Sequence, residues 1–297
     1  MLRLRGIIPP IVTPLTEDER VDEAALARQA KRLVDAGVHG IFVLGTTGEQ
    51  PALRPEERAR AIRTVVAAVG DRVPVIAGCM AASTTLAIEN LHQAAVCGAK
   101  AGALTPPYYY GSRGPAEQVA HYRACAAASP IPLLIYNIPA TTKVMLSPAV
   151  TREVAALPEV IGIKDSSGDF GHFLQLLDDL RDDPEFALFV GSPALAGAAI
   201  LYGADGAVPG LANLDPVLLV AIYEAAVARD LDRLIALQTR LHRLARIVGY
   251  GAGIACLKVA LEWMGIGRAH VTRPIEPVAS AGREAIGRLL RELELLP

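Results

Sequence analysis

The sequence predicts an α/β protein, a (β/α)8 TIM barrel with a C-terminal three-helix extension. Two observations support this fold. Short, continuously apolar runs indicate strands that are buried on both faces, as parallel strands are. These runs alternate eight times with charged segments of helical periodicity. Eight consecutive strand–helix units are the number that closes a (β/α)8 barrel.

The expected strands begin near the N-terminus. The first runs into Pro9 and Pro10 without a glycine-rich phosphate turn, which favours a barrel over a doubly wound sheet. The expected strands are 6–12, 40–44, 73–77, 101–105, 132–136, 160–163, 186–190 and 206–208. The helices expected between and after them are 22–36, 55–69, 83–97, 115–128, 147–157, 170–180, 194–202 and 216–228.

We expect the barrel to occupy residues 1–228 and a helical extension, packed on the barrel, to occupy residues 229–297. Helical periodicity predicts that the extension contains helices at 231–248, 253–264 and 280–293.

Composition excludes several classes of protein. The chain has 297 residues, is 52% hydrophobic and has a formal net charge of −2, so it is neither disordered nor broadly basic like a nucleic-acid binder. The uncharged stretch 186–204 is interrupted by Gly191-Ser192-Pro193, so it predicts a strand, a turn and a helix and no membrane span. The four cysteines lack zinc spacing and fit a reducing cytoplasm, and no metal is expected.

One lysine differs from the others in its position. The chain has 29 basic residues, and the few lysines among them are Lys31, Lys100, Lys143, Lys164 and Lys258. Four of the five lie in segments that predict helices or loops, where a lysine is normally solvated. Lys164 instead ends the apolar run 160–163, at the mouth of the expected barrel.

A lysine at the end of a buried strand can act as a nucleophile. Desolvation lowers its pKa, and the neutral amine can attack a ketone to form a Schiff base without a metal. The alternative is that Lys164 reaches solvent or pairs with Asp165 or Glu49. Position alone does not separate these two interpretations.

Polar groups at neighbouring strand ends favour the chemical interpretation. Tyr136 can place a phenol near Lys164 and relay protons. Thr46 and Thr47 stand in a glycine-flanked turn, where hydroxyls and free N–H groups suit a small carboxylate. Each feature alone is also explained by a tight turn or by core packing. Several of them around one lysine form a set that packing does not require.

These residues carry a family resemblance. The sequence resembles the dihydrodipicolinate synthase / N-acetylneuraminate lyase family over nearly its whole length. The motifs, in family order and spacing, are Gly45-Thr46-Thr47-Gly48-Glu49, Tyr136-Asn137-Ile138-Pro139 and Gly162-Ile163-Lys164-Asp165. The resemblance implies a (β/α)8 barrel with a helical C-terminal extension, assembled as a homotetramer that is a dimer of dimers.

The resemblance also implies the roles of individual residues. Lys164 forms the Schiff base with pyruvate or another 2-oxo acid, and Tyr136 is the general acid/base. Thr46 and Tyr109 complete a proton relay, with Tyr109 near a subunit contact.

Other residues are implied to bind substrate. Thr47 and the backbone of Val208 match the groups that hold the carboxylate end of the 2-oxo acid. Thr141 stands where the lysine-pathway synthases place an arginine that meets the second substrate, so a bidentate donor is missing unless Lys143 substitutes. Gly191 ends the seventh strand and is followed by Ser192, where sialic-acid lyases carry an acidic pair.

The resulting hypothesis is a metal-independent class I aldolase or lyase that uses pyruvate and an aldehyde, or their 4-hydroxy-2-oxo acid adduct. Segments such as 164–169 and 210–213 resemble 4-hydroxy-2-oxoglutarate and 2-keto-3-deoxy-acid aldolases. Three alternatives remain open. They are a dihydrodipicolinate synthase acting on pyruvate and aspartate semialdehyde, a Schiff-base dehydratase of a deoxy sugar acid, and a catalytically silent 2-oxo-acid-binding protein.

Overall fold

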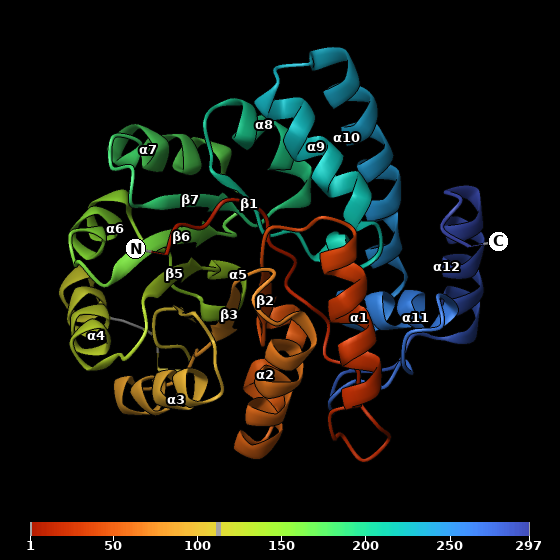
Figure 1. Ribbon diagram of the computed structural model, residues 1–297, viewed down its shortest axis with the longest axis horizontal. Coiled ribbons are helices and arrows are strands. Elements are labelled where there is room, and N and C mark those ends of the chain that lie inside the picture. The colour runs from red at the N-terminus through yellow and green to blue at the C-terminus, as the bar shows by residue number, and fades with distance from the viewer. Residues whose placement is uncertain (1, 111–113, 297) are drawn as a thin grey trace.

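The computed structural model describes residues 2–110 and 114–296, and it shows an α/β fold like a TIM barrel (Figure 1). Within those residues, eight parallel strands form one sheet in the order β1-β8-β7-β6-β5-β4-β3-β2. The strands are β1 Gly6–Ile7, β2 Ile41–Val43, β3 Val75–Gly78, β4 Ala101–Leu104, β5 Leu133–Asn137, β6 Val160–Asp165, β7 Ala187–Val190 and β8 Gly206–Ala207.

The two edges of the sheet meet at β1 and β2. The Phe42 N–H donates to the Pro9 carbonyl at 2.9 Å, and the Ile11 N–H donates to the Phe42 carbonyl at 3.0 Å. The first strand was expected to extend from 6 to 12 but ends at Ile7. Pro9 and Pro10 have no N–H group, so a regular ladder cannot continue through them. The α/β prediction with eight parallel strands is confirmed.

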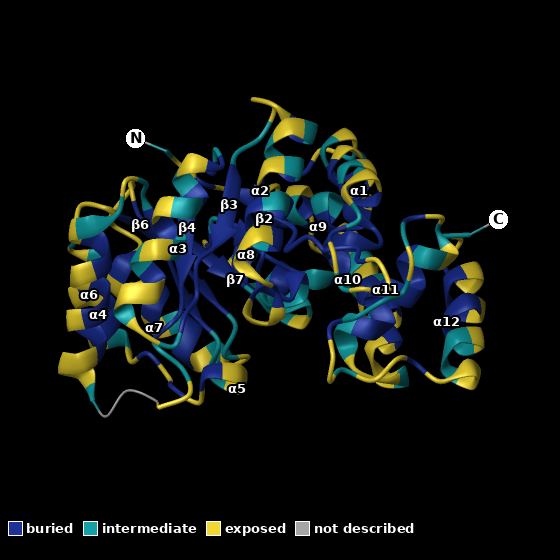
Figure 2. Cartoon of the chain, turned by 90° about the horizontal axis from the view of Figure 1, so that it is seen from below, coloured by how far each residue is buried: buried dark blue, intermediate teal, exposed yellow. Residues whose placement is uncertain are grey.

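Helices surround the strands, and their outer faces are exposed while the strands are buried (Figure 2). Short 3-10 helices add turns at the strand ends: η1 Thr46–Gly48, η2 Gln50–Ala52, η3 Pro193–Leu195 and η4 Gly210–Asn213. The α-helices up to residue 227 are α1 Glu23–Asp35, α2 Pro55–Val69, α3 Thr84–Val96, α4 Pro115–Ala128, α5 Pro139–Thr142, α6 Pro148–Ala155, α7 Phe170–Leu180, α8 Ala196–Leu201 and α9 Pro216–Val227.

Side-chain caps fix where many of these helices begin. A serine or aspartate oxygen accepts a hydrogen bond from the N–H three residues later, which satisfies a donor that the helix itself leaves free. The residues that cap in this way are Asp22, Ser83, Ser147, Asp169, Asp215 and Asp230.

Further helices follow α9: α10 Leu231–Ala245, η5 Arg246–Tyr250, α11 Gly253–Trp263 and α12 Ser280–Glu292. Helix α10 packs on α9, and α12 packs on α11 and η5. The division of the chain at residue 228 into barrel and extension stays a prediction. No single helix in the described ranges has the length and apolar composition to cross a membrane, although Leu231–Tyr250 and Gly253–Trp263, bent by 109°, pass that test as a pair.

The alternation of side chains along the strands decides which residues face the barrel interior. One buried cluster contains Leu134 and Tyr136 from β5 and Phe42 from β2, and it fills the inside of the barrel. Ile135 and Ile163 belong to the second cluster, between strands and helices. Lys164 follows Ile163 and is paired in register with Tyr136. The lysine therefore faces the interior.

Strands β1 and β8 pack closely at Gly206. A Cβ added at Gly206 would lie 1.9 Å from the Gly6 carbonyl oxygen, whereas a Cβ at Gly249 would meet nothing within 4 Å. We expect Gly206→Ala to lower the free energy of unfolding by on the order of 2 kcal/mol or more, because a backbone atom cannot move aside as a side chain does. Gly249→Ala is the matched control. Equal denaturant midpoints for the two variants would contradict this account of the β1–β8 pair.

Candidate active site

Lys164 lies at the end of β6 with its amine against two aromatic rings. Its Nζ is 3.9 Å from the centre of the Tyr136 ring and 4.8 Å from the centre of the Phe42 ring. The residue is only 3% exposed. Burial lowers the pKa of the Lys164 ammonium, and Tyr136 opposes part of that effect. Lys164 is therefore easier to deprotonate than a solvated lysine.

Tyr136 connects this amine to the turn after β2. Its hydroxyl lies 3.1 Å from Oγ1 of Thr46, the first residue of η1. The Tyr136 ring also packs edge-to-face on Phe42, with the ring centres 5.7 Å apart. The structure thus brings Lys164, Tyr136 and Thr46 together in a row, and a proton can pass along hydroxyl groups beside the amine.

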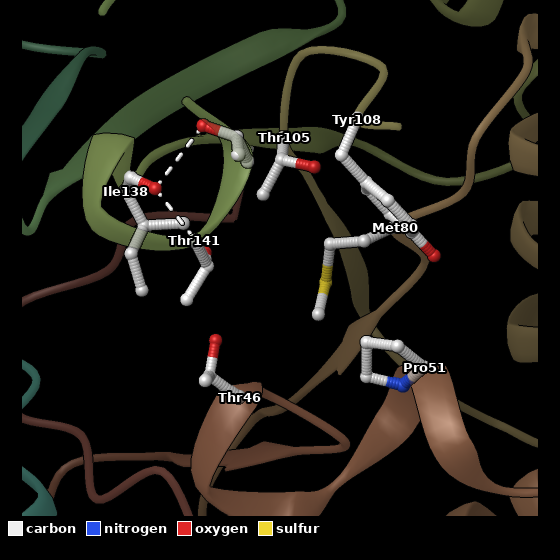
Figure 3. A pocket seen from close by; sticks show the side chains of 8 residues that line it. Thr46, Pro51, Met80, Thr105, Tyr108, Ile138 and Thr141 are labelled. Carbon is white, nitrogen blue, oxygen red and sulfur yellow. Dashed lines mark hydrogen bonds between the residues drawn. The ribbon is translucent and has the colours of Figure 1, made fainter. Parts of the chain in front are cut away.

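A cavity of about 250 Å³ lies beside Thr46, one end of this row (Figure 3). Thr46 lines the cavity and also contacts Tyr136, so it joins the cavity to the buried pair. None of the eight lining residues carries a charge: Thr46, Pro51, Met80, Thr105, Tyr108, Ile138, Thr141 and Thr142. The cavity has room for a small substrate beside Thr46, and Tyr136 and Lys164 lie behind Thr46, outside the lining.

Thr141 lines the cavity, but its hydroxyl already has a partner. Oγ1 of Thr141 donates to the Ile138 carbonyl at 3.2 Å, as Figure 3 shows. Lys143 is exposed, and its Nζ donates to the Ala140 carbonyl at 2.7 Å. In this arrangement neither residue presents the planar, bidentate donor that an arginine would offer.

The turn that carries Thr46 and Thr47 presents free donors. Neither residue's N–H donates to a backbone or side-chain acceptor in the described part of the chain, as expected for the first residues of a short helix. A Cβ on Gly210 would lie 3.6 Å from Oγ1 of Thr47, so the turn faces the loop after β8. Two N–H groups and two hydroxyls suit a carboxylate.

Val208 has only an acceptor to offer at this point. Its N–H donates to the Val190 carbonyl at 2.8 Å and is not available to a substrate. Its carbonyl oxygen suits a hydroxyl or another donor better than a carboxylate. The family resemblance implied that the Val208 backbone holds a carboxylate, whereas here it can only accept a hydrogen bond from substrate.

Tyr109 and Gly191 lie outside the row formed by Lys164, Tyr136 and Thr46. Tyr109 is 86% exposed, has φ +75° and packs its ring edge-to-face on Tyr110, so within one chain it does not reach Tyr136. The Gly191 N–H donates to the Asp165 carbonyl at 2.6 Å. A side chain at Gly191 would collide with Ser166, so this strand end is closely packed.

Asp165 does not neutralise its neighbour Lys164. Its carboxylate accepts from Nδ2 of Asn137 at 2.6 Å and from Oγ of Ser167 at 2.7 Å. Burial raises the pKa of the Asp165 carboxyl, and these hydrogen bonds oppose the rise. Among the described residues, Lys164 forms an ion pair with neither Asp165 nor Glu49, so the pairing alternative for this lysine is not what the structure shows.

Sequence reasoning missed a second buried lysine. Lys258 was expected to be solvated, and that expectation is wrong, because α11 is buried around it and Lys258 is 1% exposed. Its Nζ lies 2.5 Å from Oε1 of Glu49, directly after η1. Burial lowers the pKa of Lys258, and Glu49 opposes that effect. In the sequence, the apolar neighbours Leu257 and Val259 were the indication that Lys258 is buried and needs a partner.

Comparisons with known proteins give one consistent result. The family model described as the dihydrodipicolinate synthetase family matches residues 3–293. An uncharacterized DapA-like lyase of Halobacterium salinarum is 37% identical over 99% of this chain and 96% of its own length.

Two solved structures have the same fold. Dihydrodipicolinate synthase from Bacteroides thetaiotaomicron has a TM-score of 0.94 and 34% identity, covering 98% of this chain and 100% of that one. The chloride-inhibited dihydrodipicolinate synthase from Acinetobacter baumannii, complexed with pyruvate, has a TM-score of 0.93 and 32% identity, covering 98% and 99%.

The environment of Lys164 makes a prediction about pH. Only the neutral amine is nucleophilic, so imine formation with a ketone should accelerate as pH rises through the pKa of Lys164 and then level off. Because burial lowers that pKa from 10.5, the midpoint should lie below 10.5. The test is the initial rate of borohydride trapping with pyruvate. It is measured from about pH 6 to about pH 11, so that the range includes the titration of the amine. A midpoint at or above 10.5 would contradict the desolvated-amine interpretation.

Proposed function

The chain belongs to the dihydrodipicolinate synthetase family of class I lyases, and on that premise we propose that it is a pyruvate-dependent aldolase or lyase. Its substrate is a 4-hydroxy-2-oxo acid, whose C3–C4 bond it breaks or forms. The observation that carries the proposal is the buried Lys164 amine beside the Tyr136–Thr46 hydroxyl pair. The pyruvate complex of the Acinetobacter baumannii relative supports a 2-oxo acid as ligand.

The cleavage reaction begins at Lys164. The neutral amine attacks the C2 ketone, and the carbinolamine loses water to give an iminium ion. Tyr136 gives its proton to the departing hydroxyl of the carbinolamine and, as a phenolate, then takes the proton of the C4 hydroxyl. The C3–C4 bond breaks to release an aldehyde, and its electron pair moves into the iminium to form an enamine. Protonation at C3 and hydrolysis release pyruvate and regenerate the amine. Thr46 passes protons between Tyr136 and the cavity.

The remaining site residues have supporting roles in this proposal. Thr47 and the free N–H groups of its turn hold the 2-oxo acid's carboxylate, and the Val208 carbonyl accepts from a hydroxyl. Gly191 lies at the substrate side of the seventh strand end, where its lack of a side chain leaves room for Ser166. Tyr109 completes the proton relay at a subunit contact, and its high exposure in one chain supports this placement.

We propose the following organisation for the whole protein. The enzyme works without a metal or other cofactor, as a cytoplasmic homotetramer built as a dimer of dimers. Residues 1–228 form the barrel, and residues 229–297 form the helical extension that packs on it.

Dihydrodipicolinate synthase is the second candidate function, because the similar solved structures from Bacteroides thetaiotaomicron and Acinetobacter baumannii carry that name. Thr141 argues against it, since its hydroxyl is bound to the Ile138 carbonyl and offers no cationic partner for a second carboxylate. The two functions share the pyruvate imine and differ in the aldehyde. The aldehyde therefore has to be identified by assay.

Borohydride reduction in the presence of pyruvate tests the common step. We expect the mass of Lys164 to increase by one reduced pyruvyl group, because the imine becomes a stable secondary amine. Lys164→Ala should abolish labelling, while Lys100→Ala, a control at a different lysine, should not change it. Failure to label Lys164 in the wild-type chain would refute the proposed function.

Thr141→Arg tests the choice between the two aldehydes. An arginine in this position adds a bidentate donor toward a carboxylate. We expect wild-type enzyme to release pyruvate from at least one 4-hydroxy-2-oxo acid and to turn over aspartate semialdehyde poorly. The variant should raise kcat/KM for pyruvate plus aspartate semialdehyde by about tenfold, the effect of one modest hydrogen-bonded contact. Efficient wild-type turnover of aspartate semialdehyde would favour the synthase instead.

A further inference from the structure

We infer that Glu49 and Lys258 form a positioning pair that holds the Thr46–Thr47 turn in register with Tyr136. The inference rests on the proposed function, because it assigns these two residues to the proton transfer that follows imine formation. Neither residue touches the cavity, so both act through the turn.

The backbone at Glu49 shows how the turn depends on this residue. Glu49 follows η1 directly, and its N–H donates to the Thr46 carbonyl at 3.1 Å. Its φ is +59°, a left-handed conformation that residues other than glycine seldom adopt without support. The next residue, Gln50, starts η2. A glutamate is thus held in an unfavourable conformation at the junction of two short helices.

The Glu49 side chain is tied to the C-terminal part of the chain. Its Oε1 pairs with Nζ of Lys258 at 2.5 Å, and its Oε2 accepts from the N–H and the hydroxyl of Thr272, each at 2.7 Å. Nζ of Lys258 also donates to the His270 carbonyl at 2.6 Å. Both charged side chains are 1% exposed. The turn is therefore anchored to α11 and to the segment that follows it.

The other anchors of this turn are neutral. Oγ1 of Thr13 donates to the Gly48 carbonyl at 2.9 Å, and Nε2 of Gln50 donates to the Met80 carbonyl at 2.9 Å. Together with Glu49 they hold three consecutive residues. Glu49 supplies the charged anchor, two residues after Thr47.

Stability alone does not account for a buried ion pair. Its desolvation cost offsets much of its attraction, and an uncharged, well-packed replacement is often equally stable. What a pair with fixed partners does provide is a defined position for both groups. The position fixed here is that of Thr46, whose Oγ1 contacts the Tyr136 hydroxyl.

Hydrogen exchange at C3 of pyruvate isolates the step that this pair should control. The iminium loses a C3 proton to form the enamine, and in heavy water a deuteron returns. The exchange therefore reports proton transfer without a second substrate. The amount of imine trapped by borohydride at end point reports Lys164 alone. The exchange rate and the yield of trapped imine are both measured in wild type, Glu49→Gln, Lys258→Met and the double variant. The exchange rate reports proton transfer, and the yield reports imine formation at Lys164.

We expect Glu49→Gln to slow the exchange by on the order of 10- to 100-fold, the cost of misplacing a catalytic group by about 1 Å. The end-point yield of trapped imine should stay at the wild-type level. In the double variant both charges are gone, so the melting temperature should return toward wild type while exchange stays slow. Glu57→Gln is the matched control, because Glu57 is also buried but binds the Val21 N–H and Arg60, away from η1.

Exchange at the wild-type rate in Glu49→Gln, or recovery of exchange along with stability in the double variant, would overturn the inference. If the single charge variants do not fold, Thr272→Val removes only one hydroxyl donor and should still slow exchange several-fold, on the order expected for one lost hydrogen bond. A wild-type rate there would overturn it equally. Absence of trapping in the wild-type protein would instead refute the proposed function itself.

Discussion

A lysine amine buried against aromatic rings, without a carboxylate partner, is the constraint on which the site depends. Lys164 meets the faces of Tyr136 and Phe42 and lies at the end of a strand inside the barrel. Lys258 is buried as deeply, yet it has Glu49 at 2.5 Å. The carboxylate favours the charged form of Lys258, while Lys164 has no such partner among the described residues. Two buried lysines thus differ in whether a carboxylate stabilises the charged form.

The barrel creates this environment through its strand register. Tyr136 and Lys164 are paired in register on neighbouring parallel strands, so their side chains lie next to each other on the inside. The interior below them is filled by apolar side chains, which exclude water from the amine. The turn after β2 then brings Thr46 within 3.1 Å of the phenol. Strand pairing thus brings Lys164 and Tyr136 together, and the turn after β2 adds Thr46.

Much of this arrangement could be predicted from the sequence. The apolar runs predicted eight parallel strands, and the strand-end position of Lys164 distinguished it from the other lysines without use of the family resemblance. Local chemistry explains some differences, such as the early end of β1 at the prolines. Other features depend on contacts between distant segments. The Glu49–Lys258 pair joins residues 209 positions apart in sequence, and the bond from Val208 to Val190 depends on strand pairing. Tyr109 faces solvent, so the relay role expected for it stays a prediction.

In the proposed function, Lys164 binds a 2-oxo acid covalently, with Tyr136 and Thr46 beside the new bond. A crystal structure of the protein soaked with pyruvate tests this most directly. We expect continuous electron density from Nζ of Lys164 to C2 of pyruvate, with the carboxylate at the N–H groups of Thr46 and Thr47. Pyruvate bound without a covalent link, or linked to a different lysine, would contradict it.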